Sequence, residues 1–155
     1  MYTLKRTQQL PIDVQIAWQF FSDPRNLPVI TPPDLGFEIT SGLPEQMYAG
    51  MLVSYKVAAA PGIKVRWITE ITHVRENEFF VDEQRFGPYR FWHHQHHFKA
   101  VAGGVEMTDL VSYLLPFQPF AQLAAPLVRR RLEHIFDYRY ATLETIFSSA
   151  KGGNL

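Results

Sequence analysis

No cysteine occurs among the 155 residues of the sequence. Disulfide bonds, thiol nucleophiles and metal sites built on cysteine are therefore excluded together. The sequence also lacks a net charge, because 15 lysine and arginine residues balance 15 aspartate and glutamate residues. Without a positive field, a protein has no general attraction for nucleic acid or for an anionic membrane surface. We therefore expect no nucleic acid among its partners.

Long apolar runs and targeting patterns are absent as well. No run approaches the roughly 18 to 20 residues that cross a bilayer, and the first residues do not resemble a signal peptide. Phosphate-binding glycine loops, dinucleotide fingerprints and Ser-His-Asp arrangements are also missing. We expect a cytoplasmic protein with no transmembrane segment, cofactor or bound metal ion. The length predicts one domain over residues 1–150 and a frayed tail over residues 151–155.

Aromatic residues, in contrast, are plentiful: 12 phenylalanines, seven tyrosines and three tryptophans can fill a core or line a pocket. The richest segment is a predicted strand over Phe91–Ala100, which also contains four histidines. Side chains alternate between the two faces of a strand. The inner face therefore carries Trp92, His94, His96 and Phe98. We expect His93 and His97, on the opposite face, to be solvated.

A second strand is predicted over Val105–Pro116, and its inner face is apolar except for Asp109. Adjacent glycines between the two strands predict a hairpin, for which two registers are open. If both glycines form the loop, His94 faces Tyr113; if the loop begins one residue earlier, His96 faces Asp109. Both registers leave Asp109 close to His96. A carboxylate and two imidazoles on an apolar face are costly unless they are paired, hydrated or used.

Alternation also predicts strands over Tyr2–Leu10, Phe37–Thr40, Met51–Val57, Ile63–Val74 and Phe79–Phe86. Asp13 is expected to cap a short helix after the first of these strands. A second short helix should end before Pro32 and Pro33, because proline cannot continue a helix. From Pro119 to about Ser148, apolar residues recur every three or four positions. This spacing predicts one long amphipathic helix, with a kink or split at Pro126.

The order of these elements predicts an α+β fold. A bent antiparallel sheet cannot bury its inner face unaided, and the last helix is long enough to cover it. Sheet and helices together would enclose a cavity, which Phe136 and Tyr140 are expected to close. The strand pairs that we expect are Trp67–Phe86, Thr69–Gln84, Ile71–Asp82, Phe86–Trp92, Gln84–His94 and Asp82–His96. The expected ligand-binding residues are Trp67, Thr69, Asp82, Gln84, Phe86, Trp92, His94, His96, Asp109, Tyr113, Phe136 and Tyr140.

Four runs of the sequence resemble bacterial ligand-binding proteins of the START-like, or SRPBCC, superfamily, which includes polyketide cyclases. The runs are Asp13–Phe37, Gly87–Phe98, Gly103–Phe117 and Leu127–Arg139. The resemblance implies a helix-grip fold: a bent antiparallel sheet of six to seven strands around one long C-terminal helix, with two short helices after the first strand. It also implies a hydrophobic ligand between sheet and helix. The superfamily contains carriers, receptors and enzymes, so the fold names neither ligand nor activity.

The polar residues of the inner face have three interpretations. They can form an internal hydrogen-bond network, or the polar contacts of a mostly apolar ligand pocket. They can also carry chemistry: His94 and His96 could bind a metal ion with a carboxylate, or His96 and Asp109 could form a general base. The leading hypothesis is binding or carriage of a small hydrophobic or aromatic molecule. The alternatives are a cyclase, dehydratase or hydrolase acting on such a molecule, and an interaction module built on phenylalanines of residues 116–126.

Overall fold

The structure is a computed structural model of the whole chain. It describes residues 1–60, 62–117 and 121–148, apart from the side chains of residues 59 and 60. The tail that we expected to fray, residues 151–155, lies outside the described residues, as do Pro119 and Phe120. In the part of the chain that the structure describes, no helix is both long enough and apolar enough to span a membrane.

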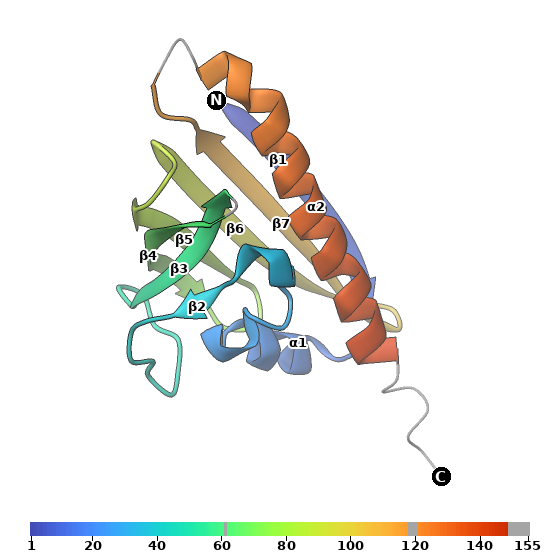
Figure 1. Cartoon of the computed structure of the whole chain (residues 1–155). Helices are drawn as coiled ribbons and strands as arrows, with labels where there is room; N and C mark the ends of the chain where they lie inside the picture. Colours follow the sequence, from blue (N-terminus) through green and yellow to red (C-terminus); the bar gives the residue numbers. More distant parts are fainter. Residues whose placement is uncertain (61, 118–120, 149–155) are drawn as a thin grey trace.

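A seven-stranded antiparallel sheet forms the body of the molecule, with the strands in the order β1-β7-β6-β5-β4-β3-β2 (Figure 1). The strands are β1 (Tyr2–Leu10), β2 (Glu38–Ile39), β3 (Leu52–Ala60), β4 (Ile63–Arg75), β5 (Phe79–Phe86), β6 (Phe91–Val101) and β7 (Gly104–Leu114). The long helix α2 (Ala121–Ser148) runs beside β1 and β7, and the short helix α1 (Val14–Phe21) lies near its end. This is the α+β, helix-grip architecture expected from the sequence.

Helix α2 is one continuous helix, so the expected split at Pro126 is wrong. Proline cannot donate the hydrogen bond that a helix interior would direct to the Gln122 carbonyl, and Gln122 is an exposed residue on the solvent side of the helix. Two apolar residues of the first turns, Leu123 and Leu127, are 84 % and 73 % exposed and do not pack on the sheet. Phe117, in the segment predicted as an interaction module, is also exposed.

Helix α1 begins after Asp13, as expected, although the Asp13 side chain makes no capping hydrogen bond. The second short helix is instead two short 3-10 turns, η1 (Pro24–Asn26) and η2 (Pro33–Leu35). Pro32 and Pro33 prevent a longer α-helix through this segment, because each lacks the N–H group that a helix interior requires. The second of the two expected short helices is therefore present as a 3-10 helix, η1, and not as an α-helix.

The β6–β7 hairpin adopts the second of the two registers considered. Its loop begins one residue before the adjacent glycines, which places His96 opposite Asp109. Gly103 has a φ of 82°, a conformation that glycine adopts without strain. Gly104 belongs to β7, where a side chain would collide with the carbonyl oxygen of Leu10 on β1. One glycine thus serves the turn, and the other allows the close approach of two strands.

Strand β5 keeps two of the expected pairs with β4, but the expected Trp67–Phe86 pair is wrong. Phe86 pairs with Ile68 instead, which leaves Arg85 as an extra residue on β5. A one-residue bulge reverses the face of the side chains beyond it. Phe86 therefore points outward and is 59 % exposed. The confirmed pairs are Thr69–Gln84 and Ile71–Asp82.

The pairing of β5 with β6 differs from the expected pairing by two residues. Asp82 lies opposite His94, not His96, and His96 lies opposite Phe80. A shift of two residues leaves each side chain on its original face of the sheet. Asp82, His94 and His96 therefore still share the inner face, although the expected pairs were wrong.

The connection between β5 and β6 explains why their pairing differs by two residues from the expected one. Pairing stops at Glu83, so the expected partners of Gln84 and Phe86 on β6 are also wrong. The Gln84 side chain donates a hydrogen bond to the Tyr89 carbonyl at 2.6 Å and accepts one from the Tyr89 N–H at 3.1 Å. These two bonds satisfy backbone groups of the connection, and they take Gln84 away from the sheet interior.

Two clusters of buried side chains fill the space between the sheet and the helices. One surrounds α1 and the end of α2, and includes Trp18, Phe80, Phe98, Leu143 and Phe147. The other lies under the earlier part of α2, and includes Leu4, Trp67, Trp92, Val111 and Phe136. The histidines of β6 connect the clusters, because His96 stacks on Phe80 and His94 packs edge to face on Phe136.

Candidate functional site

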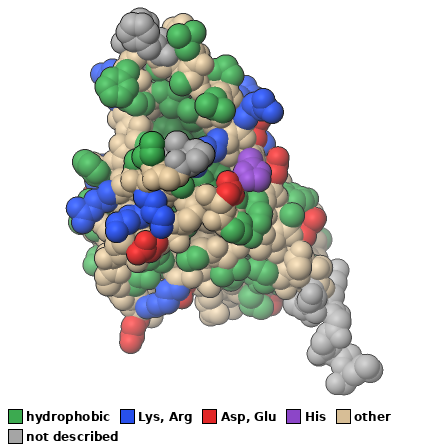
Figure 2. Space-filling model, viewed as in Figure 1, with side chains coloured by type: hydrophobic (Ala, Val, Ile, Leu, Met, Phe, Trp, Pro, Cys, Tyr) green, Lys and Arg blue, Asp and Glu red, His purple; other side chains and the backbone are tan. Residues whose placement is uncertain are grey.

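A cavity of about 550 Å³ lies between the inner face of the sheet and α2. Its walls are mostly apolar and come from α1, β3, β4 and α2. In the view of Figure 2, hydrophobic side chains gather on the upper half of the molecule, where α2 begins. Pockets of about 300 to 1,000 Å³ commonly hold small organic ligands. The cavity therefore has a suitable size and lining for a small apolar molecule.

Part of the predicted set of binding residues surrounds this cavity. The members that line it are Trp67, Thr69, Asp82, Trp92, His94, His96 and Phe136. The members that do not line it are Gln84, Phe86, Asp109, Tyr113 and Tyr140. Gln84 and Phe86 are displaced by the connection and the bulge of β5, respectively, so they are corrections to the expected site.

The three other predicted residues that do not line the cavity are kept from it for separate reasons. Tyr113 is buried beside the cavity and stacks on Tyr2, with ring centres 5.4 Å apart. Tyr140 is 43 % exposed, so the expectation that it closes the cavity is wrong. The buried stripe of α2 passes from Phe136 through Arg139 to Leu143, and Tyr140 falls beside this stripe. Asp109 lies on β7 against the two histidines, and it does not line the cavity itself.

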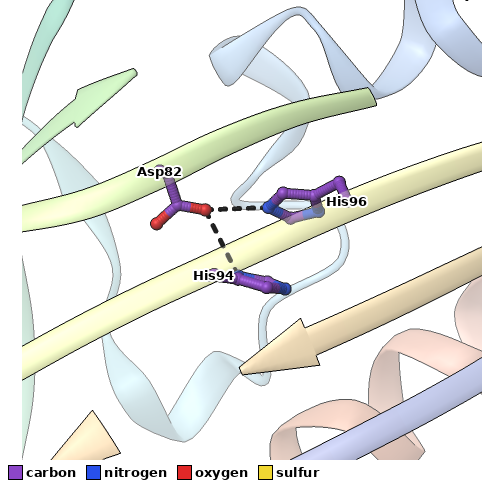
Figure 3. A group of neighbouring side chains, drawn as sticks. All are labelled: Asp82, His94 and His96. Atoms are coloured by element: carbon purple, nitrogen blue, oxygen red, sulfur yellow. Dashed lines mark hydrogen bonds and ion pairs between the residues drawn. The ribbon is translucent and has the colours of Figure 1, made fainter. Parts of the chain in front are cut away.

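Four ionisable side chains meet at this floor, and we call them the His–Asp cluster: Asp82 on β5, His94 and His96 on β6, and Asp109 on β7. Figure 3 shows Asp82 pointing at both histidines. Its Oδ2 accepts a hydrogen bond from His96 Nε2 at 2.8 Å and lies 3.3 Å from His94 Nδ1. The two imidazole centres are only 3.7 Å apart. One carboxylate oxygen thus bridges two neighbouring imidazoles.

Asp109 makes a similar bridge on the other side of the imidazoles. Its Oδ1 accepts a hydrogen bond from His94 Nε2 at 2.8 Å and lies 2.9 Å from His96 Nδ1. The second contact is close but does not have hydrogen-bond geometry, so His96 Nδ1 has no hydrogen-bond partner among the described residues. His94, His96 and Asp109 are all buried. Each histidine therefore lies between the same two carboxylates.

The cluster changes the acidity of its own members. Burial raises the pKa of both carboxyl groups, but His94 and His96 outweigh it and hold the pKa of Asp82 below its ordinary range, and that of Asp109 well below. Burial lowers the pKa of His94, but the two carboxylates outweigh it and raise that pKa. Both carboxyl groups are therefore ionised at neutral pH, and the two carboxylates make His94 easier to protonate than an unpaired imidazole.

Arg139 is a cavity residue that the sequence analysis missed. It is 9 % exposed, and its Nη1 lies 3.6 Å from Asp109 Oδ1. Its guanidinium carbon lies 4.9 Å from the centre of the Phe136 ring, and its Nε has no hydrogen-bond partner among the described residues. The helical period offered a signal, because position 139 falls between Phe136 and Leu143 on the buried stripe. A charged residue there requires a partner.

The part of the cavity wall formed by β3 and β4 contains an uncharged polar group. The Tyr55 hydroxyl on β3 lies 3.1 Å from Thr69 Oγ1 on β4, which also accepts a hydrogen bond from Trp67 Nε1 at 3.0 Å. Tyr89, from the β5–β6 connection, joins the same wall. Neither tyrosine was predicted, because alternation alone does not distinguish a cavity position from a core position.

The free energy of unfolding is expected to fall as the pH rises above about 10. Burial, reinforced by the charge of Asp82, raises the pKa of Tyr55 above its ordinary value of 10.0, against the hydrogen bond with Thr69 and the charge of Arg139. Burial likewise raises the pKa of Tyr89. The unfolded chain then releases protons that the folded chain retains, so alkaline pH favours unfolding. Urea unfolding between about pH 9 and 11 measures this decline.

Tyr55→Phe should make that decline shallower, because one of the groups that titrates only on unfolding is removed. Tyr48→Phe provides the control, since the Tyr48 side chain is 55 % exposed. If the stability of Tyr55→Phe fell with pH as steeply as that of the wild type, Tyr55 would not be a source of the alkaline dependence.

Comparisons with known proteins identify the fold. No family model and no curated protein matches the sequence. Protein Ms6760 from Mycobacterium smegmatis matches with a TM-score of 0.70 at 20% identity, over 96% of this chain and 92% of that chain. Protein CV1439 from Chromobacterium violaceum matches with a TM-score of 0.71 at 12% identity, over 94% of this chain and 96% of that chain.

A third similar structure is Ara h 8.0201, with a TM-score of 0.61 at 13% identity over 93% of this chain and 98% of that chain. Ara h 8 is a Bet v 1-like protein with a START/SRPBCC-type fold. At such low identities, the likeness concerns the fold alone. The chain therefore shares its overall fold with these three proteins.

Proposed function

We propose that the protein binds or carries a small hydrophobic or aromatic molecule in the cavity between the sheet and α2. The observation that carries this proposal is the combination of apolar walls with a compact charged floor. The floor consists of Asp82, His94, His96 and Arg139. Ligand pockets typically combine an apolar lining with a few polar groups that orient the ligand.

The wall supports an aromatic ligand in particular. Trp67 packs edge to face on Trp92 at 5.2 Å and on Tyr89 at 5.4 Å between ring centres. Such rings offer both edges and faces to a flat molecule. At the floor, the buried Nε of Arg139 is a donor without a hydrogen-bond partner among the described residues. The ligand that best fits this cavity has an apolar, flat body and a polar group at the end that faces the charged floor.

Filling the cavity tests this proposal directly. Val128 on α2 is half-buried and lines the cavity, so Val128→Trp should occupy space that a ligand needs. We expect the variant to bind anilinonaphthalene sulfonate, an aromatic anionic fluorophore, at least about tenfold more weakly than the wild type. Fluorescence titration measures the affinity, and circular dichroism verifies that the variant is folded.

The neighbouring residue provides a matched control. Leu127 is 73 % exposed and does not line the cavity, so Leu127→Trp adds the same side chain outside it. This control should bind the fluorophore as the wild type does. Equal affinities of Val128→Trp and the wild type would place the fluorophore elsewhere and contradict binding in the cavity.

A second candidate function is catalysis on the same kind of molecule. It is favoured by the two histidines, which line the cavity and are each held by a carboxylate. His96 contacts Asp82 through Nε2 and lies near Asp109 through Nδ1. Such a pair can act as a general acid or base in a cyclase, dehydratase or hydrolase reaction. A ligand identified by co-purification would be incubated with the protein; its recovery unchanged would contradict the enzymatic alternative.

A further inference from the structure

We propose that Asp82, His94 and His96 bind one divalent transition-metal ion at the floor of the cavity. This inference is independent of the proposed ligand, because it concerns only the polar floor. Among the described residues, these three form the group whose ligand atoms, one from each side chain, all lie within 4.8 Å of one another. Figure 3 shows the carboxylate and the two imidazoles converging from two strands.

Two of the three separations between the ligand atoms match those around a bound metal ion, and all three are below 4.8 Å. Asp82 Oδ2 lies 2.8 Å from His96 Nε2 and 3.3 Å from His94 Nδ1. Metal–ligand bonds of about 2.0 to 2.2 Å place neighbouring ligand atoms about 3 Å apart. An ion could therefore bind between these three atoms after small movements of the side chains.

The supporting elements are rigid. Asp82 and His94 lie opposite each other on the paired strands β5 and β6, and His96 follows His94 on the same face. Ligands on paired strands keep their positions more precisely than ligands on loops. The packing of His96 on Phe80, at 4.1 Å between ring centres, also restricts that imidazole.

Asp109 is positioned to accept hydrogen bonds from both imidazoles, through the ring nitrogens that would not bind the ion. If His94 binds the ion through Nδ1 and His96 through Nε2, their other nitrogens carry protons. These are His94 Nε2 and His96 Nδ1, which lie 2.8 Å and 2.9 Å from Asp109 Oδ1. Metal-binding histidines usually direct their second N–H group to such an acceptor. A small rotation would give the buried His96 Nδ1, which has no hydrogen bond among the described residues, a partner in Asp109.

The donor set indicates the chemical class of the ion. Calcium and magnesium prefer oxygen ligands alone, whereas copper(I) prefers sulfur. Two imidazole nitrogens and one carboxylate oxygen suit zinc, ferrous iron or cobalt(II). Three protein ligands also leave coordination positions for a small molecule, and these positions would face the cavity. The ion would thus bring a Lewis acid to the polar end of the ligand pocket.

The outward face of β6 provides a matched control. His97 lies on the same strand as His94 and His96 but on the opposite face of the sheet, and is exposed. Its Nε2 lies 2.9 Å from the Gln95 side-chain oxygen, outside the His–Asp cluster. His97→Gln therefore removes a histidine from this strand without altering the proposed ligands.

The test is metal titration of the untagged protein, with cobalt(II) followed by its visible absorption and zinc by calorimetry. We expect the wild type and His97→Gln to bind one ion per chain. His96→Gln and Asp82→Asn should each weaken binding by at least about 100-fold, because each removes a direct ligand. Asp109→Asn should weaken it by about 10- to 100-fold without changing the stoichiometry, as expected for a supporting group.

Failure of the wild type to bind one ion, or equal losses in His97→Gln and His96→Gln, would overturn the proposal. A direct readout covers the case in which a variant does not fold. In NMR spectra of the wild-type histidine ring nitrogens, one equivalent of zinc should shift His94 and His96 but not His97; shifts of His97 instead would place the ion elsewhere. These readouts do not depend on the fluorophore, so metal binding and ligand binding can fail separately.

Discussion

Asp109→Ala is expected to lower the free energy of unfolding by about 3 to 5 kcal/mol, the usual cost of leaving a buried charge without its partner. Asp109 is 7 % exposed and contacts both histidines of the cluster and Arg139. Among the described residues, it is the only carboxylate within ion-pair distance of Arg139. The variant would therefore bury an unpaired guanidinium. Urea unfolding at neutral pH measures the loss.

An exposed ion pair between α2 and β1 provides the control. Asp137 lies 3.7 Å from Arg6, and its side chain is 71 % exposed. Asp137→Ala should change the stability by no more than about 0.5 kcal/mol, because solvent screens such pairs. A loss below about 1 kcal/mol in Asp109→Ala would mean that water reaches Arg139 and that burial of the pair contributes little.

Removing both charges distinguishes the cost of an unpaired buried charge from the loss of side-chain packing. In the double variant Asp109→Leu/Arg139→Leu, neither charge remains buried alone. Its stability should therefore exceed that of Asp109→Leu, because paired buried charges replaced together by apolar side chains cost little. A double variant less stable than Asp109→Leu would instead indicate that Arg139 contributes mainly through its packing on Phe136.

Alternation along the strands was sufficient to predict which side chains share the inner face. It placed Asp82, His94, His96 and Asp109 on one face, and the structure brings these four together. The prediction was robust because a register error of two residues moves a side chain along its strand without turning it over. It could not identify which histidine faces Asp82, because that pairing depends on the length of the β5–β6 connection.

Features that interrupt a regular pattern were not predictable in the same way. The extra residue Arg85 turns Phe86 to the outside, and no residue in this run marks the bulge, such as a glycine. Gln84 is held by the Tyr89 backbone, a contact that only the folded connection creates. Both were expected in the pocket because strict alternation was extended to the end of β5.

In helix α2, by contrast, the sequence did contain the information needed, because its helical period places Arg139 on the buried stripe. Apolar residues alone defined the expected stripe, so Tyr140 was included and Arg139 was not. The buried residues follow steps of three and four through Phe136, Arg139 and Leu143. A cation on such a stripe is costly unless an anion faces it, and Asp109 was the acidic residue already predicted on the inner face of the sheet.

The second prediction with a large expected effect on stability concerns Leu143, on the same buried stripe of α2. Leu143→Ala is expected to lower the free energy of unfolding by about 2 to 5 kcal/mol, the range for deleting a buried leucine side chain. Leu143 is 1 % exposed and belongs to the buried cluster around α1, together with Phe147 of the same helix. Its truncation would leave a void where the end of α2 meets the sheet. The midpoint of urea unfolding, with an unchanged m-value, reports this loss.

Leu123→Ala is the matched control, because it deletes the same atoms from the same helix where the side chain is 84 % exposed. Its effect should stay within about 0.5 kcal/mol. The sequence pattern treats the two leucines alike, whereas the structure assigns a core position to Leu143 and an exposed position to Leu123. Equal losses in the two variants would contradict that assignment. A large loss in Leu143→Ala alone would mean that burial, and not the helical spacing of an apolar residue, decides how much a leucine of α2 contributes to stability.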